Sequence, residues 1–253
     1  MKSILILCFA LALSTTTHAQ TTSYELTVTD AAHHLAEVAV TFPNVTEKAL
    51  TVKLPVWRSG RYEILNLGKN LRDMSAKQNG HSLTVTQIDK NTWKVFLKSP
   101  GAVTFNYEVY ANMLRHRVAH IDDSHAFIDA SGFFMFSESF RQEPVTVNLD
   151  VPKKWRSVSG MDNLKGKNSF RAADYDVLVD SPIETGINQL HTFEVEGREY
   201  DLVVWGDGNY DVELMLTDPQ VIQTAKEMNF SLESDDAKDI ASRVVSVSIT
   251  AKK

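Results

Sequence analysis

The segment RVAHIDDSHAFID, from Arg117 to Asp129, holds two histidines and three aspartates within thirteen residues. Imidazole and carboxylate groups ligate metals and transfer protons. On a helix, His116 and His120 at spacing i, i+4 could bind one zinc ion, but on a strand they lie roughly 13 Å apart. The flanking residues are aromatic and β-prone, so we expect a polar, exposed strand end and a DDSH turn rather than a metal site.

Two other kinds of catalytic site deserve comparison. Glycosidase chemistry needs two carboxyl groups at a set separation, and the candidates are Asp122, Asp123, Asp129, Glu138 and Glu143. Spacing along the sequence does not fix their separation in space. The chain has no G-x-S-x-G motif, and none of its eight histidines precedes a glutamate, which excludes H-E-x-x-H. We therefore assign no catalytic residue and no metal ligand.

Binding remains a possible role for several side chains. Trp57, Arg61 and Tyr62, in LPVWRSGRYEI, could form a platform, although Trp57 at a sheet edge is more typical of a core residue. The residues retained as candidates for a substrate-facing surface are Trp57, Arg61, Tyr62, His116, His120, Asp122, Asp123 and His125. HHLAE, from His33 to Glu37, is expected to be an exposed loop.

The elements that must position these residues are predicted to be strands. Apolar and polar residues alternate in the segments 24–30, 35–42, 49–57, 92–97, 103–111 and 143–152. Turn-forming residues such as QNGHS and KSPG separate them, as in an antiparallel sandwich. A hairpin with its turn near EGR is expected at 191–206. The prediction is an all-β, antiparallel β-sandwich-like domain followed by a short C-terminal α-helix and a tail.

The helix is predicted from TDPQVIQTAKEM, where Asp218 is the N-cap and Pro219 the first helical residue. An acidic stretch and an alternating segment around Val245 follow. We expect the apolar side chains of this helix to lack a partner and to promote self-association. They are Val221, Ile222, Ala225 and Met228.

The N-terminus has the pattern of a secretory signal, with Lys2, an apolar run and THA before Gln20. Cleavage after Ala19 would remove the only cysteine, Cys8, so neither disulfides nor thiol catalysis is expected. The net charge of −6 argues against a nucleic-acid partner. Because the apolar run is too short to span a bilayer, we expect no membrane association after cleavage and a periplasmic or secreted protein.

Several motifs resemble a known family in the same order and with similar spacing. They are LPVWRSGRYEI, DKNTWKV, YEVYAN, VAHIDDSHAF and ADYDVLVDSPIETG. Together they resemble the N-terminal domain of the glycyl aminopeptidase family of zinc metallopeptidases, from about Tyr24 to about Met228. The resemblance implies a β-rich domain that precedes a thermolysin-like zinc catalytic domain, whose ligands match no position here.

The domain organisation expected from this resemblance has three parts. Residues 1–19 are the signal peptide, 20–216 the β-rich peptidase N-terminal domain, and 217–253 the truncated beginning of a catalytic domain. The expected function is to position a peptide substrate without catalysing its cleavage. No cofactor is expected in this chain, because zinc would belong only to the catalytic domain. Possible partners are a peptide, a catalytic domain or a second copy. Alternatives are a free-standing periplasmic peptide- or carbohydrate-binding module and, third, a carbohydrate-active enzyme.

Overall fold

A computed structural model describes residues 21–56, 64–113, 119–206, 211–223, 226 and 244–247. The first strands are β1 (Thr22–Asp30), β2 (Leu35–Val45), β3 (Ala49–Lys53), β4 (Leu71–Gln78), β5 (His81–Asp89), β6 (Thr92–Phe96), β7 (Gly101–Tyr110), β8 (His120–Ile121) and β9 (His125–Ile128). The later strands are β10 (Val145–Asp150), β11 (Arg156–Ser159), β12 (Asp162–Asn163), β13 (Ser169–Ala172), β14 (Ile183–Gly186), β15 (Asn188–Val195), β16 (Arg198–Trp205) and β17 (Val244–Val247). The helices are η1 (Leu67–Asn70), α1 (Ala130–Phe133), η2 (Glu138–Phe140), α2 (Tyr175–Asp180) and α3 (Val212–Leu216).

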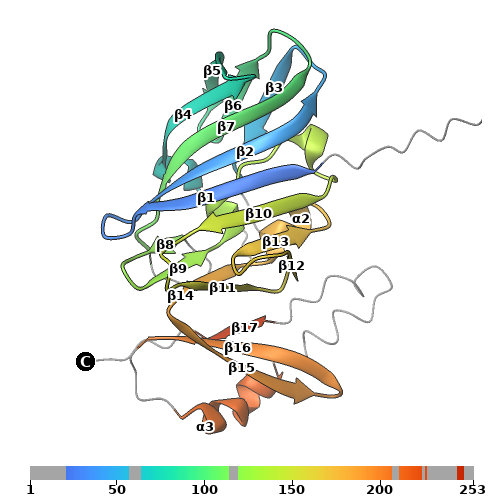
Figure 1. Cartoon of the computed structure of the whole chain (residues 1–253). Helices are drawn as coiled ribbons and strands as arrows, with labels where there is room; N and C mark the ends of the chain where they lie inside the picture. The colour runs from blue at the N-terminus through green and yellow to red at the C-terminus, as the bar shows by residue number, and fades with distance from the viewer. Residues whose placement is uncertain are drawn as a thin grey trace, which may run out of the picture.

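The strands form three sheets, and in Figure 1 the third, β15 to β17, lies below the other two. The first has the order β12-β13-β10-β1-β2-β7-β4-β5-β6-β3, the second β11-β14-β9-β8, and the third β15-β16-β17. We call the first two sheets the body and the third the C-terminal sheet. The predicted all-β, sandwich-like class is therefore confirmed, with only short helices among the described residues.

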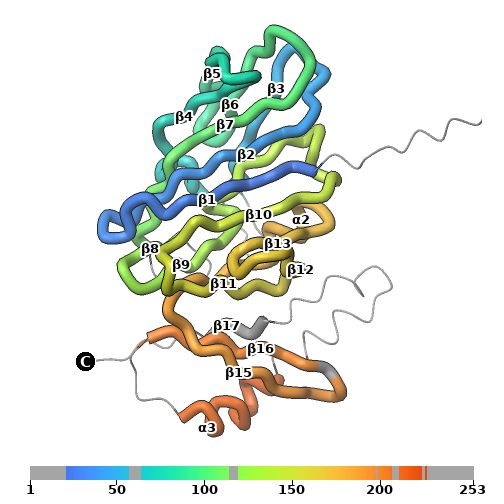
Figure 2. Tube along the Cα trace, viewed as in Figure 1, coloured from blue at the N-terminus to red at the C-terminus, as the bar shows by residue number. Residues whose placement is uncertain are grey.

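One pairing within the body departs from the antiparallel prediction. Strands β1 and β10 pair in parallel, with Thr22 opposite Val145 and Thr27 opposite Asp150. Figure 2 shows these segments side by side, although most of the body lies between them in the chain. Parallel neighbours need a long crossover rather than a tight turn, so local sequence patterns carry no signal for this pairing. The pairing of β16 with β17 is also parallel.

Alternation predicts the strands that have one buried face. In β7, every second residue from Val103 to Val109 is buried. Two of the hairpin turns also follow from sequence, because Asn79–Gly80 and Glu196–Gly197 adopt the positive φ that type I′ turns require. The hairpin expected near EGR is thus confirmed.

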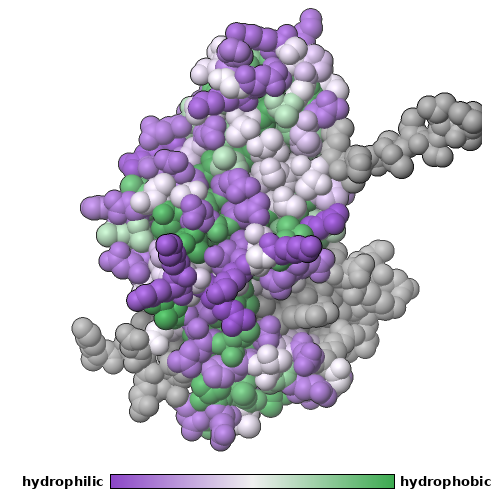
Figure 3. All heavy atoms as spheres, viewed as in Figure 1, coloured by the Kyte–Doolittle hydropathy of each residue, from purple (hydrophilic) through white to green (hydrophobic). Residues whose placement is uncertain are grey.

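One strand missed by the sequence analysis, β5, has no fully buried residue to reveal it. Only Leu83 and Val85 of β5 reach the core, where they are partly buried, so the core-facing part of this strand is short. In Figure 3 the end of the molecule where β5 lies is mostly hydrophilic. The turn at Asn79 still joins β4 to β5. These two strands pair with Ala76 opposite Leu83 and Gln78 opposite His81.

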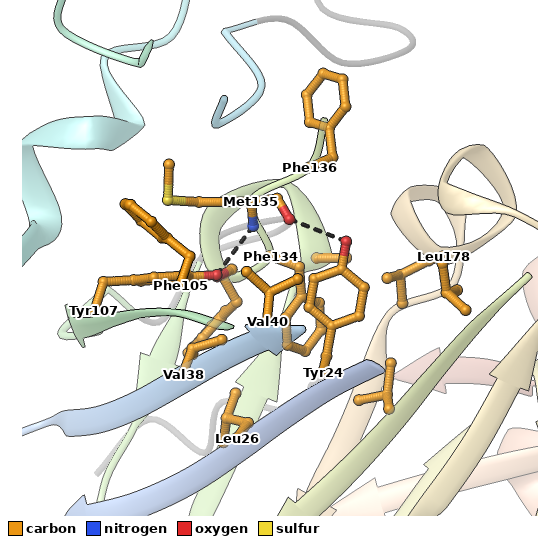
Figure 4. Close-up of a cluster of buried hydrophobic side chains, with 14 of the residues drawn as sticks. Tyr24, Leu26, Val38, Val40, Phe105, Tyr107, Phe134, Met135, Phe136 and Leu178 are labelled. Carbon is orange, nitrogen blue, oxygen red and sulfur yellow. Dashed lines mark hydrogen bonds between the residues drawn. The ribbon is translucent and has the colours of Figure 1, made fainter. Parts of the chain in front are cut away.

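The centre of the body is organised around the hydroxyls of three buried tyrosines, Tyr24, Tyr107 and Tyr175. Figure 4 shows Tyr24 and Tyr107 with Met135 between their hydroxyls. Tyr24 donates to the carbonyl of Met135 at 3.0 Å, and Tyr175 donates to that of Phe134 at 2.7 Å. Tyr107 donates to the carbonyl of Phe133 at 2.8 Å and accepts from the amide of Met135 at 3.0 Å. The irregular segment after α1 can therefore cross the core because these hydroxyls satisfy its backbone groups.

Burial also changes the acidity of these phenols. It raises the pKa of Tyr107 above its ordinary value. The pKa values of Tyr24 and Tyr175 are likewise raised, first by burial and then by neighbouring tyrosines. All three hydroxyls therefore stay protonated and able to donate across the physiological range.

The predicted C-terminal helix is confirmed at its beginning. Asp218 accepts from the amide of Gln220 at 2.7 Å, and its carbonyl accepts from Ile222 at 3.1 Å. Residues 219–223 and 226 are helical, and α3 precedes them unpredicted. Ile222 packs against the buried Val195 and Tyr200 of the C-terminal sheet. The expectation that Ile222 lacks a partner is therefore wrong, while Ala225 and Met228 lie outside the described residues.

Candidate functional site

The DDSH segment forms a tight turn between β8 and β9. One carboxylate oxygen of Asp122, Oδ1, accepts from the amide of Ser124 at 2.8 Å, from its hydroxyl at 2.9 Å and from the amide of His125 at 3.0 Å. An aspartate that satisfies the backbone ahead of it is the reason this sequence turns. The predicted turn is confirmed, and it places a histidine on each side.

His120 lies two residues before Asp122, so strand alternation gives both side chains the same face. Their Nε2 and Oδ2 atoms are 3.0 Å apart. Burial would raise the pKa of Asp122, but hydrogen bonds from Ser124 and His120 outweigh burial and hold the pKa below its ordinary value. This carboxylate is therefore ionised at neutral pH.

His125 has a second, more deeply buried carboxylate partner. Its Nε2 lies 2.5 Å from Oε2 of Glu184, and their side chains are 4% and 11% exposed. Glu184 comes from β14, which pairs with β9 in the register Glu184 to Phe127. The sequence analysis missed Glu184, because 59 residues separate it from His125 and only strand pairing brings them together.

The two histidines belong to a row of rings that runs from the body to the C-terminal sheet. His34, at the β1–β2 turn, lies 6.3 Å from His120 between ring centroids, and His120 lies 5.8 Å from His125. His125 stacks on Trp205 of β16, with centroids 4.2 Å apart and planes at 22°. His34 joins the site through Nδ1, 2.5 Å from the carbonyl of Ile121, instead of lying in the wholly exposed loop we predicted.

The burial of the histidines corrects another expectation. His120 is 6% exposed and His125 is 3% exposed, so they do not form the exposed strand end predicted from sequence. Asp123 of the same turn is exposed. Of the other candidates, Trp57, Arg61, Tyr62 and His116 lie outside the described residues.

The chemistry open to the cluster is set by its ring nitrogens. The Nδ1 atoms of His120 and His125 are buried and have no hydrogen-bond partner. Within the described part of the chain, no group of three or more His, Cys, Asp or Glu side chains is arranged to hold a metal ion. The described residues of this cluster therefore form two histidine–carboxylate pairs and not a peptidase zinc site.

Two of the carboxylates considered for glycosidase chemistry, Asp129 and Glu138, have structural partners. Asp129 caps α1 by accepting from the amide of Ser131 at 3.0 Å, and Glu138 lies 3.3 Å from Lys53 Nζ. The ion pair of Glu138 borders a pocket of about 280 Å³ between β3 and η2, with Glu47 and Ser137 also in its wall. This pocket contains no histidine and lies apart from the ring row.

No helix in the described part of the chain combines the length and apolar character needed to cross a membrane. A comparison with curated proteins finds no match. A search of solved structures finds an aminopeptidase N family protein from Idiomarina loihiensis, 27% identical, with a TM-score of 0.77. The match covers 89% of this chain but 38% of that one, so this chain spans well under half of that relative.

A second structure shares the fold at lower similarity. It is an M1 zinc metallopeptidase from Deinococcus radiodurans, 11% identical, with a TM-score of 0.50, and the match covers 93% of this chain and 57% of that one. The Peptidase M61 N-terminal domain matches residues 23–187, which include the β8–β9 turn, both histidines and Glu184. This chain therefore belongs to the family of peptidase M61 N-terminal domains and carries an N-terminal domain of the zinc aminopeptidase type.

Proposed function

We propose that this chain acts as the non-catalytic N-terminal part of a glycyl-aminopeptidase-like zinc peptidase and positions peptide substrate when joined to a catalytic domain. The observation that carries the proposal is the family match over residues 23–187. The similarity to an aminopeptidase N family protein over 89% of this chain supports it, because that relative has a much longer chain. We further propose export, with the signal removed after Ala19.

The surface of the C-terminal sheet supports a partner on that side. Beside this sheet, Ile187, which precedes β15, is 60% exposed and Leu214 of α3 is 68% exposed. Figure 3 shows hydrophobic residues at the surface over this part of the visible face. Apolar surface of this kind is typical of a place where another domain packs. Self-association through the same surface is the competing possibility.

A chimaeric enzyme tests the proposal. The segment of the Idiomarina protein that aligns with this chain would be replaced by residues 21–226, and hydrolysis of a glycyl chromogenic substrate measured. We expect an active chimaera, whereas the full chain alone has no peptidase activity. An inactive but folded chimaera, or activity in the chain alone, would contradict the proposal.

The substrate-facing residues are tested in the same chimaera. We expect Trp57→Ala, Arg61→Ala and Tyr62→Ala to raise KM with little change in kcat, since positioning residues contribute binding shared by ground and transition states. Lys77→Ala, on the exposed side of β4, is the matched control and should change neither constant. If the chimaera is indifferent to all three variants and the full chain alone binds peptides or oligosaccharides in calorimetry, the free-standing binding module is the better interpretation.

A further inference from the structure

Strand β3 forms one edge of the ten-stranded sheet, where β6 is its neighbour on the inner side. The even-numbered residues bond toward β6, as the amide of Leu54 does just beyond the strand by donating to the carbonyl of Asn91 at 2.9 Å. Backbone groups of successive residues point to opposite sides of a strand. The N–H and C=O groups of Ala49, Thr51 and Lys53 therefore face the free edge.

The described part of the chain uses this edge at one position. Lys53 and Phe136 exchange both backbone hydrogen bonds, at 2.7 and 2.8 Å, which is the pattern of an antiparallel pair. The chain after Phe136 stays extended for one more residue and then turns into η2, away from the edge. No described residue bonds the outward backbone groups of Ala49 and Thr51. Their N–H and C=O groups are therefore open to another extended chain.

The pocket between β3 and η2 lies along these open groups. Its wall contains Ala49 and Thr51 on one side and the hydroxyl-bearing Ser137 and Ser139 on the other. Leu50, which is buried, also borders it. A volume of about 280 Å³ is slightly below the roughly 300–1,000 Å³ of typical ligand pockets. It suits a short extended segment and not a folded element.

The charged groups beside the pocket leave one carboxylate available. Lys53 Nζ lies 3.3 Å from Oε1 of Glu138, so these two charges compensate each other. Glu47 is exposed, and its partner within the described chain is the neighbouring threonine hydroxyl at 3.4 Å. Of the other lysines, Lys48 is not part of the described wall, and Lys94 is paired with β3 from β6, on the far side of the strand. A cationic side chain is therefore the complement of Glu47.

We propose that an extended peptide segment docks on the free edge of β3 by pairing with Ala49 and Thr51 and placing a lysine or arginine beside Glu47. The segment runs antiparallel to β3, because it continues the line that Phe136 begins. Its side chains alternate, with polar ones outward and apolar ones toward Leu50. In strand addition of this kind, backbone hydrogen bonds give affinity and alternate side chains give selectivity.

A peptide fits this edge better than a second copy of the chain does. In a second copy the segment 137–139 borders β3 in the same way, so two such edges would bring these walls into the same space. Strand β3 is also short and ends in a lysine, as is typical of edges protected against pairing with themselves. A single extended chain has no such wall.

This docking site goes beyond the proposed function. In Figure 1, β3 lies toward the end of the molecule opposite the C-terminal sheet, where a catalytic domain is expected to pack. Activity of the chimaera tests the positioning of substrate, whereas a peptide titration of the full chain alone tests the docking. Either proposal can therefore fail while the other holds.

The test titrates the full chain, labelled with nitrogen-15, with the acetylated and amidated probe TVTVK and follows the amide resonances by NMR. In the expected register, the first probe residue lies opposite Thr51, the third opposite Ala49, and the lysine beside Glu47. The amides of Ala49 and Thr51 should move downfield as they gain hydrogen bonds. Those of Leu50 and Val52, which already face β6, should move much less.

Two methylated probes test the backbone pairing on the unaltered protein. Methylating the third probe nitrogen, which faces Ala49, should weaken binding about tenfold, because one hydrogen bond is lost. Methylating the fourth nitrogen, which faces away from β3, is the matched control and should leave binding unchanged.

Variants of the chain test the same two contacts. Thr51→Pro removes the outward N–H without removing a bond to β6, so binding should weaken about tenfold, whereas Thr51→Ala keeps the N–H and should bind normally. If the proline variant does not fold, the methylated probes decide. The probe TVTVE should bind about two- to fivefold more weakly than TVTVK. Glu47→Gln should abolish this preference, and Glu37→Gln, an exposed glutamate on β2, should retain it.

The docking would be overturned by any of three observations. One is that the amides of Ala49 and Thr51 do not move, or move no more than those of Leu50 and Val52. Another is that the two methylated probes bind equally well. The last is that the Ala49 and Thr51 amides move with protein concentration when no probe is present, because a second copy would then occupy the edge.

Discussion

Replacing Tyr107 by phenylalanine should be the most costly removal of a single hydroxyl in the body. The hydroxyl serves two backbone groups, the carbonyl of Phe133 and the amide of Met135, at 2.8 and 3.0 Å. Both groups would remain buried without a partner. Each such loss costs about 1–2 kcal/mol, so the free energy of unfolding should fall by about 2–4 kcal/mol.

The other two tyrosines provide a graded comparison. Tyr24 and Tyr175 each donate one hydrogen bond to a backbone carbonyl, so Tyr24→Phe and Tyr175→Phe should cost about 1–2 kcal/mol each. Tyr110→Phe is the matched control, because Tyr110 lies on the same strand as Tyr107 and is 41% exposed. Tyr110→Phe should change the free energy of unfolding by no more than about 0.5 kcal/mol.

Urea unfolding followed by circular dichroism measures these differences. At a slope of about 2 kcal/mol per molar urea, Tyr107→Phe should lower the midpoint by about 1–2 M. A Tyr107→Phe variant as stable as Tyr110→Phe would refute the argument that these hydroxyls support the crossing segment. A cost no greater than that of Tyr24→Phe would refute the claim that Tyr107 satisfies two groups.

Alkaline conditions test the same three tyrosines. Because their pKa values are raised in the folded protein, the stability that they provide is complete below about pH 10 and is lost above it. For the three tyrosines together, the free energy of unfolding should fall by about 3 kcal/mol between pH 10 and pH 11. Each single Tyr→Phe variant should remove about a third of that slope in urea titrations. Gly186→Ala should destabilise the body by about 1–3 kcal/mol, because the new Cβ would lie 2.8 Å from the carbonyl oxygen of Ser124. Gly132→Ala is the control and should cost less than about 1 kcal/mol, because its Cβ would lie 3.6 Å from the nearest atom. Equal costs of the two variants in thermal unfolding would contradict this argument. The pKa of Asp122 is lowered, despite the opposing effect of burial, by hydrogen bonds from Ser124 and His120, so its stabilising contribution should be present above about pH 4 and lost as the pH falls below that value. Asp122→Asn should flatten this acid limb, and an unchanged limb would count against the assignment.

The sequence by itself determined the local features of this protein. Alternation marks β1, β2 and β7 because each has one face in the core. The turn at Asn79–Gly80 and the helix start at Asp218 depend only on neighbouring residues, which is why residue type sufficed. The family was also recognisable, because its motifs follow one another along the chain.

The candidate site shows where local information ends. The DDSH turn was predictable, since Asp122 bonds the residues directly after it. The burial of His120 and His125 was not, because their polar sequence context is typical of an exposed turn. What covers them comes from β14 and β16, which sequence patterns near residue 120 do not reveal.

Only the tertiary structure decided which distant groups meet. Three contacts join residues that share no local sequence pattern. They are the parallel pairing of β1 with β10, the hydrogen bond from the Tyr107 hydroxyl to the carbonyl of Phe133, and the stack of His125 on Trp205. Turns and caps are fixed by hydrogen bonds within a few residues, whereas these contacts depend on the order of strands in the sheets. That order is set by burial of the whole core, and it turned an apparent surface cluster into a buried junction.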